Sequence, residues 1–189
     1  GGTAYDSIAT SSFVGGNDGA ISGASWSPLG KYGSALDFDG DDDNVVVADN
    51  NKIETGFVTI SAWIKPNETS ANINILGRRN DAYRFRLSDG DTLWAYLNDG
   101  SNAEGVASSH VISPNIWQHV ALVYDGSQTT FYLDGISDVQ TTISVSGELN
   151  QDSTQNLFIG HYYSNQEVFD GLIDELKIYT TRRRSRLIF

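Results

Sequence analysis

Residues 33–47 read Gly-Ser-Ala-Leu-Asp-Phe-Asp-Gly-Asp-Asp-Asp-Asn-Val-Val-Val. Two short apolar stretches flank a turn, and five aspartates fall within the seven residues 37–43. This pattern predicts two β-strands joined by an acidic turn. Aspartates at this density repel one another unless water or a cation neutralises them, and Ca²⁺ is a hard cation with flexible oxygen coordination. A calcium site and a solvated turn both remain open, because Asp, Asn and Gly are also ordinary turn residues.

The composition limits the classes of function that the chain can have. It has 189 residues and no cysteine, which excludes a disulfide framework and a thiolate zinc site. Its formal net charge of −12 disfavours nucleic acid and anionic membrane as partners. No apolar run reaches the length of about 18 residues that a transmembrane helix needs. Membrane insertion is therefore not expected, and no signal peptide is recognised.

The pattern along the chain is that of an all-β protein. Short runs of β-branched and aromatic residues are separated by Gly, Asn, Asp and Ser. Strands are predicted near residues 19–26, 34–39, 44–48, 57–65, 73–78, 82–88, 92–98, 105–111, 116–124, 128–134, 140–145, 156–160 and 171–179. So many closely spaced strands favour an antiparallel β-sandwich. We expect a single domain over residues 1–180, followed by a basic C-terminal tail at 181–189.

Several segments carry motifs that follow one another in a fixed order. They are residues 30–40 (GxxGxALxFDG), 57–66 (a Trp-containing strand that ends in Pro), 117–126 (WxHVAxxYDG), 131–135 (a strand that ends in Asp-Gly), and 157–160 with 171–179 (an Ile-Gly pair, then GxIDExxIY). Together they resemble the laminin-G-like domains of the concanavalin-A-like lectin/glucanase superfamily. The resemblance implies a jelly-roll sandwich of two curved antiparallel sheets, often with a calcium ion.

The two ends of the chain depart from the family pattern. The family's first apolar strand precedes the segment with which this chain begins, and an arginine-rich stretch follows the last motif. Residues 187–189 are apolar, and we expect them either to fill the place of the missing strand or to end a disordered tail.

The last predicted strand contains a carboxylate that needs compensation. Strict alternation places Asp174 on the same face as Leu172, Leu176 and Ile178, which is apolar. A carboxylate there requires a cation, an arginine or backbone donors. The resemblance implies a calcium carboxylate near this position. The expected ligands of a structural Ca²⁺ are Asp174, Asp39, Asp41, Asp43 and Asp6.

The predicted hairpin at residues 82–98 places large aromatic side chains on its polar face. Alternation separates the apolar set Tyr83, Phe85, Leu87, Leu93, Ala95 and Leu97 from the set Arg84, Arg86, Trp94, Tyr96 and Asn98. Aromatic residues on an outer face indicate a binding surface, and sugars stack on rings while their hydroxyls bond to Arg and Asn. The expected carbohydrate-binding residues are Trp94, Tyr96, Arg84, Arg86 and Asn98, with His161 and Tyr162 from the predicted loop at residues 161–167. A loop that buries these aromatics is the alternative.

Other residues have simpler interpretations. Arg78 and Arg79 could join Arg84 and Arg86 in a cationic patch that favours an anionic glycan, or each could pair with a neighbouring aspartate. The three residues His119, Trp63 and Trp117 are interpreted as packed core side chains.

No catalytic pattern is recognised. Glucanases of the family that the chain resembles carry Glu-x-Asp-x-x-Glu or Glu-x-Asp-x-Glu on one strand, and neither occurs here. The sequence predicts a non-catalytic, calcium-stabilised, lectin-like module that binds a polysaccharide or glycan. We expect it to belong to a larger secreted or surface protein, bacterial in origin, alongside other domains. The alternative is a protein-interaction or adhesion domain that binds no glycan.

Overall fold

The computed structural model describes residues 2–4, 17–50, 53–70, 72–78, 82–151, 154–162 and 167–179. These residues form strands and connecting loops. The strands are β1 (Thr3–Ala4), β2 (Gly19–Ser22), β3 (Ser25–Ser27), β4 (Ala35–Asp39), β5 (Asn44–Val47), β6 (Val58–Pro66), β7 (Ile73–Arg78), β8 (Tyr83–Leu87), β9 (Thr92–Asn98), β10 (Ala103–Val111), β11 (Gln118–Tyr124), β12 (Thr129–Leu133), β13 (Ile136–Gln140), β14 (Leu157–Ile159) and β15 (Asp170–Tyr179). Within the described ranges, no helix is long and apolar enough to cross a membrane.

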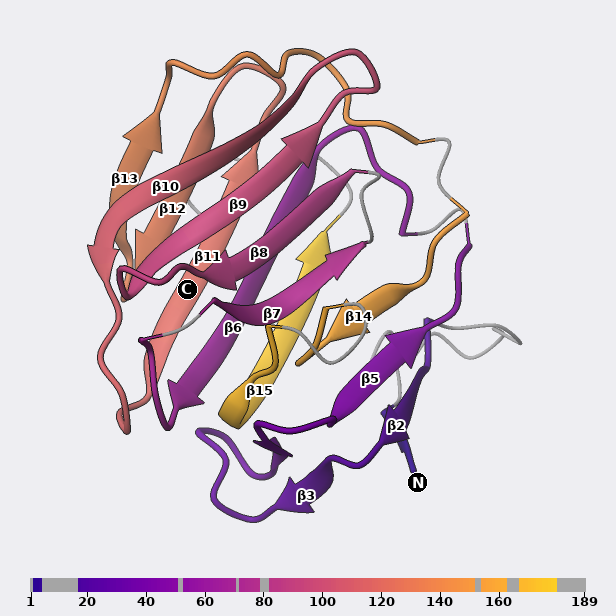
Figure 1. Cartoon of the computed structure of the whole chain (residues 1–189), viewed down its shortest axis with the longest axis vertical. Coiled ribbons are helices and arrows are strands. Elements are labelled where there is room, and N and C mark those ends of the chain that lie inside the picture. Colours follow the sequence, from indigo (N-terminus) through magenta and orange to yellow (C-terminus); the bar gives the residue numbers. More distant parts are fainter. Residues whose placement is uncertain are drawn as a thin grey trace.

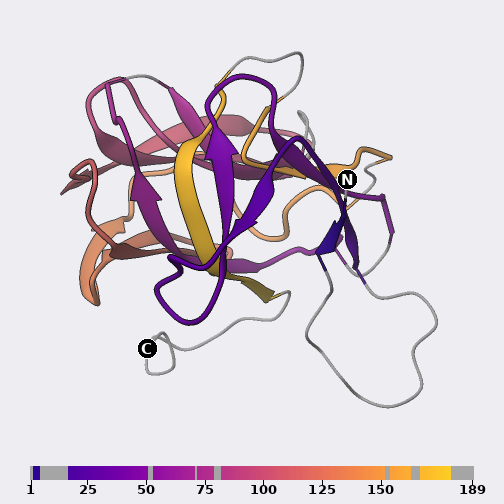
Figure 2. The ribbon, with the colours of Figure 1, turned by 90° about the horizontal axis from the view of Figure 1, so that it is seen from below.

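The strands form two antiparallel sheets that pack face to face (Figures 1 and 2). One sheet has the order β1-β2-β5-β14-β7-β8-β9-β10, and the other has the order β13-β12-β11-β6-β15-β4-β3. In Figure 1, β8, β9 and β10 lie in front of β6, β11 and β12. The expected all-β jelly-roll sandwich is confirmed. The tail at 181–189 lies outside the described residues.

The core lies between the sheets and follows the predicted alternation in β8 and β9. Tyr83, Phe85 and Leu87 are fully buried, and so are Leu93, Ala95 and Leu97. Because successive side chains of a strand point to opposite faces, the residues between them lie on the outer face of the eight-stranded sheet. This is the face on which the candidate site is built.

The alternation breaks in β15, and the inference from parity about Asp174 was wrong. Glu175 has a φ of 50°, and the register against β6 shifts between Asp174 and Lys177. This β-bulge inserts a residue and moves the following side chains to the other face. Ile173 belongs to the core and Leu176 packs against it, whereas Asp174 lies on the outer face with its neighbour across the sheet, Trp63.

Trp63 is not the core tryptophan that the sequence suggested. Its side chain is part-buried on the outer face of β6, with its ring edge-to-face against Tyr32 at 6.0 Å and against His119 at 5.3 Å between centroids. The Lys31 ammonium lies 4.2 Å from the centroid of the same ring. Burial lowers the pKa of His119. Its ring contact with Trp63 fits the packed structural role expected for it. Trp117 is also only part-buried.

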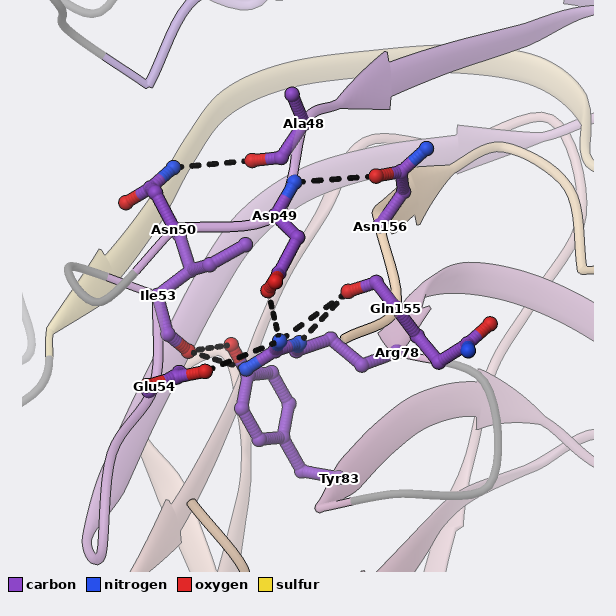
Figure 3. Close-up of polar contacts among 9 residues, drawn as sticks. All are labelled: Ala48, Asp49, Asn50, Ile53, Glu54, Arg78, Tyr83, Gln155 and Asn156. Carbon is purple, nitrogen blue, oxygen red and sulfur yellow. Dashed lines mark hydrogen bonds and ion pairs between the residues drawn. The ribbon is translucent and has the colours of Figure 1, made fainter. Parts of the chain in front are cut away.

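Arg78 is fully buried at the end of β7 and ties three segments together (Figure 3). Its guanidinium donates to the Asp49 carboxylate at 2.6 Å, to the carbonyl of Gln155 at 3.1 and 3.2 Å, and to that of Ile53 at 3.3 Å. The Tyr83 hydroxyl donates to the same Ile53 carbonyl at 3.0 Å. Arg78 is therefore a structural anchor rather than part of a cationic surface, and Arg79 lies outside the described residues.

The edge strands β10 and β13, one from each sheet, are joined along one side of the sandwich. The Asp138 carboxylate of β13 accepts hydrogen bonds from the Ser109 backbone N–H at 2.6 Å and from the Ser108 and Ser109 hydroxyls, each at 3.1 Å. Partial burial acts to raise the pKa of Asp138, but these hydrogen bonds outweigh it and hold the pKa below its ordinary value. We call this contact the edge seam.

Candidate functional site

Two neighbouring strands bring the predicted binding residues together on the outer face of the eight-stranded sheet. Arg86 is paired with Trp94, and Arg84 is paired with Tyr96, in the register of β8 against β9. Directly opposed side chains on one face lie within contact distance. The expected cluster of Trp94, Tyr96, Arg84 and Arg86 is therefore present, and all four side chains are part-buried.

The guanidinium groups lie over the aromatic rings. The Arg86 Cζ lies 4.0 Å from the Trp94 ring centroid, and the Arg84 Cζ lies 5.1 Å from it. Trp94 and Tyr96 stack with their centroids 6.5 Å apart and their planes 27° apart. Each cation–π contact of this kind contributes about 0.5–2 kcal/mol. The indole is therefore partly covered by arginine, so the surface presents guanidinium groups as well as aromatic carbon.

Glycines in the adjacent strands let these side chains lie flat on the sheet. A Cβ at Gly105 of β10 would lie 2.3 Å from Cζ2 of Trp94, and a Cβ at Gly77 of β7 would lie 2.7 Å from Cγ of Arg84. Sequence reasoning missed both positions. The available signal was a glycine within a predicted strand, which often marks a close approach by another group.

The loop before β15 completes the cluster from the other side. The Tyr162 ring centroid lies 4.1 Å from the Arg84 Cζ. The Glu167 carboxylate accepts hydrogen bonds from Nη1 of Arg84 at 2.8 Å and from Nη1 of Arg86 at 3.4 Å. Burial lowers the pKa of Arg86, although Glu167 acts in the opposite direction. We call Arg84, Arg86, Trp94, Tyr96, Tyr162 and Glu167 the arginine–aromatic platform.

Asn74 of β7 fixes this loop to the sheet. Its side-chain amide donates to the His161 carbonyl at 2.9 Å, and its backbone N–H donates to the Glu167 carbonyl at 3.0 Å. Arg86 Nη1 also donates to the Asn72 side-chain oxygen. These two asparagines were not identified from the sequence, because the partners of Asn74 lie in a distant loop and Asn72 precedes its strand, where alternation does not apply.

Two residues expected at the site have other surroundings. His161 is buried, with its ring edge-to-face against Phe158 at 5.8 Å, and it meets Asn74 through its carbonyl. Burial lowers the pKa of His161. Asn98 lies at the end of β9, where its side-chain oxygen accepts a hydrogen bond from the Gly100 N–H at 2.7 Å.

The acidic turn between β4 and β5 gathers three carboxylates. Asp39, Asp42 and Asp43 each bring one oxygen to within 4.8 Å of the others. Asp43 is buried, with 6% of its surface exposed, and accepts a hydrogen bond from the Asp39 N–H at 2.9 Å. Burial, followed by repulsion from neighbouring aspartates, raises the pKa of Asp43 despite that hydrogen bond. Three crowded carboxylate oxygens suit a hard cation such as Ca²⁺.

Of the other expected metal ligands that the structure describes, neither Asp41 nor Asp174 belongs to this cluster. Asp41 lies in the same turn, where its N–H donates to Asp39, but Asp42 takes its place in the group. Asp170 is paired with Asp39, so Asp174 lies four residues farther along β15. The Asp174 carboxylate accepts backbone hydrogen bonds from Tyr32 at 2.8 Å and Glu175 at 2.7 Å. These backbone donors compensate the buried charge of Asp174. Asp6, the remaining expected ligand, lies outside the described residues.

Comparison with known proteins identifies the family to which this fold belongs. The family model described as the concanavalin A-like lectin/glucanases superfamily matches residues 39–187. Domain 4 of AbnA, a GH43 extracellular arabinanase from Geobacillus stearothermophilus solved with arabinotriose, superposes with a TM-score of 0.71 at 20% identity over 90% of this chain and 85% of that one. The LG1–3 region of the laminin α2 chain gives a TM-score of 0.60 at 17% identity over 76% of this chain and 30% of that one.

Two further relatives are similar. A putative carbohydrate binding protein from Bacteroides ovatus gives a TM-score of 0.58 at 20% identity over 88% of this chain and 44% of that one. Adhesion G-protein coupled receptor V1 of Danio rerio is 25% identical over 132 residues, or 65% of this chain. The aligned part is 2% of that receptor's length. Taken with the two-sheet architecture, the match over residues 39–187 shows that the chain belongs to the concanavalin A-like lectin/glucanase superfamily as a laminin-G-like domain.

Proposed function

We propose that the domain is a non-catalytic module that binds glycans through the arginine–aromatic platform. The observation that carries the proposal is the juxtaposition of Trp94, Tyr96 and Tyr162 with two guanidinium groups on the outer face of one sheet. Aromatic rings offer surfaces for the C–H faces of sugars. The guanidinium groups offer fixed donors to sugar oxygens.

The relatives support a carbohydrate-binding or adhesion role. They include an arabinanase domain solved with arabinotriose, a putative carbohydrate binding protein and an adhesion receptor. An extracellular location, within a larger protein that has other domains, fits these relatives. A protein-interaction role is the second candidate, and it is favoured by the exposure of Trp26 in β3 and of Leu29 and Tyr32 after it.

Trp94→Ala tests the platform. We expect it to weaken glycan binding by about 2 kcal/mol, roughly 30-fold, because the ring supports both arginines and lies at the centre of the cluster. Gly105→Ala should also weaken binding, since its Cβ would displace the indole. The measurement is titration calorimetry with the best binder from an oligosaccharide array. The matched control is Trp26→Ala, which removes a tryptophan that is 56% exposed on the other sheet.

Unchanged affinity in Trp94→Ala and Gly105→Ala would place glycan binding elsewhere. A larger loss in Trp26→Ala would favour the surface beside β3. If the array shows no binding in calcium buffer, the glycan proposal fails and the protein-interaction role gains.

We further propose that Asp39, Asp42 and Asp43 hold a structural Ca²⁺. Saturation at 100 times the dissociation constant would stabilise the fold by about 2.7 kcal/mol, raising the melting temperature by about 5–10 °C. Asp42→Asn should abolish this rise, whereas Asp41→Asn should retain it. The measurement is a thermal melt with calcium and with excess chelator. Equal melting temperatures with calcium and with chelator, at matched ionic strength, would contradict the calcium proposal.

A further inference from the structure

The platform carries an excess of positive charge in an acidic protein. Among the described residues, Arg84 and Arg86 form ion pairs with one carboxylate, that of Glu167, while the whole chain has a net charge of −12. Asp89, in the turn after β8, also raises the pKa of Arg86, but by less than Glu167 does. The two arginine side chains keep 13% and 12% of their surface exposed, so a ligand from solvent can reach them.

Three polar atoms at the platform are buried without a hydrogen-bond partner among the residues that the structure describes. They are Nε of Arg84 and Nε of Arg86 in the platform, and Oδ1 of the neighbouring Asn74, whose side chain is fully buried. Buried polar groups are nearly always bonded, because an unmet donor or acceptor costs about 1–3 kcal/mol. Three such atoms around one cluster indicate that the described groups alone leave its polar arrangement incomplete.

Glu167 adopts an unfavourable backbone conformation where it bridges the two arginines. Its φ is 56°, in the left-handed region that costs a residue with a side chain roughly 1–2 kcal/mol. Its carbonyl is held by the Asn74 N–H, and its carboxylate contacts both guanidinium groups. Glu167 thus presents a carboxylate to the arginine pair as an acidic ligand would.

We infer that Arg84 and Arg86 form a subsite for the carboxylate of a uronic-acid sugar, and that Glu167 occupies this subsite until such a sugar displaces it. The inference rests on the proposed glycan-binding function and names its ligand class. A guanidinium matches the planar geometry of a carboxylate and forms charge-assisted bonds about twice as strong as neutral ones. A neutral sugar offers only hydroxyl groups, which compete poorly with the Glu167 carboxylate.

The first test compares matched oligosaccharides. Trimers of galacturonic, glucuronic and mannuronic acid are titrated against the wild-type domain by calorimetry, beside the trimers of galactose, glucose and mannose. At low salt we expect at least one acidic trimer to bind about tenfold tighter than its neutral partner. Raising the salt to 0.2 M should reduce that difference only in part, because partly buried charges are screened less than exposed ones.

The second test removes the internal carboxylate. Glu167→Gln should tighten binding of the acidic trimer about tenfold more than that of the neutral trimer, since the competing carboxylate is gone. Glu175→Gln is the matched control: it removes the same charge from the other sheet, from a glutamate that also has positive φ and an ion pair. It should change neither affinity.

The outcomes separate the two proposals. If neutral trimers bind as well as acidic ones, the uronic-acid subsite is overturned and the glycan-binding function stands. If the wild type binds no trimer of either kind, the uronic-acid subsite is overturned; the glycan-binding function is overturned as well only if the oligosaccharide array also shows no binding. If Glu167→Gln weakens acidic binding, Glu167 is part of the binding surface rather than its occupant, and the inference fails. Circular dichroism of the variant verifies its fold, and the wild-type comparison decides the matter if the variant does not fold.

Discussion

Replacing Arg78 by methionine is expected to lower the free energy of unfolding by about 3 kcal/mol, at the lower end for breaking a buried ion pair. Methionine fills most of the volume but donates no hydrogen bond to Asp49, Ile53 or Gln155. The Asp49 side chain is 30% exposed and can recover some hydration, which limits the loss. The Ile53 carbonyl keeps its bond from Tyr83.

Denaturation in urea measures this effect, and an exposed pair provides the control. Nζ of Lys177 lies 2.5 Å from Oε2 of Glu175, and both side chains are more than a third exposed, at 48% and 40%. Lys177→Met should therefore cost less than about 1 kcal/mol. If the two methionine variants lost similar stability, the three segments around Arg78 would not depend on its guanidinium.

Gly171→Ala is expected to cost about 3 kcal/mol, because backbone strain and steric overlap act together. Gly171 has a φ of 129°, and a Cβ there would lie 2.3 Å from the Lys65 carbonyl oxygen. Its other nearest atoms also belong to the backbone, at Pro66 and Asn67. The residue is paired with both β6 and β4, so neither strand can withdraw without losing register.

Gly33→Ala separates the two causes. Gly33 has a φ of 75°, and nothing lies within 4 Å of the position of its Cβ. This variant should show the strain alone, about 1 kcal/mol. Urea denaturation of both variants gives the comparison. Equal losses would mean that the neighbouring backbone yields to the methyl group and that overlap contributes nothing.

The fold could be predicted from the sequence wherever strict alternation persists. In β8 and β9 the apolar residues alternate without interruption, and the structure confirms which face is buried. In β15 the sequence suggests continued alternation, but the side chains do not alternate between the two faces, because Glu175 adopts a positive φ within a bulge. No side-chain pattern marks that insertion, so Asp174 was assigned to the wrong face.

The candidate site could be predicted in part for the same reason. Trp94, Tyr96, Arg84 and Arg86 come from one hairpin, where local sequence determines the neighbours. Glu167 reaches Arg84 from 83 residues away, and a contact of that kind leaves no local periodicity. In the acidic turn, alternation does not apply, and so the choice of Asp42 over Asp41 depends on the path of the backbone.

The edge seam has a consequence for how copies of this domain behave when they are crowded. Free backbone donors along an edge strand recruit strands of other molecules and promote aggregation. At Ser109 that donor is already bonded to a carboxylate, and the lowered pKa of Asp138 keeps the group charged in mildly acidic solution. The edge seam therefore removes one of the backbone donors with which a strand of a neighbouring copy could pair on this side.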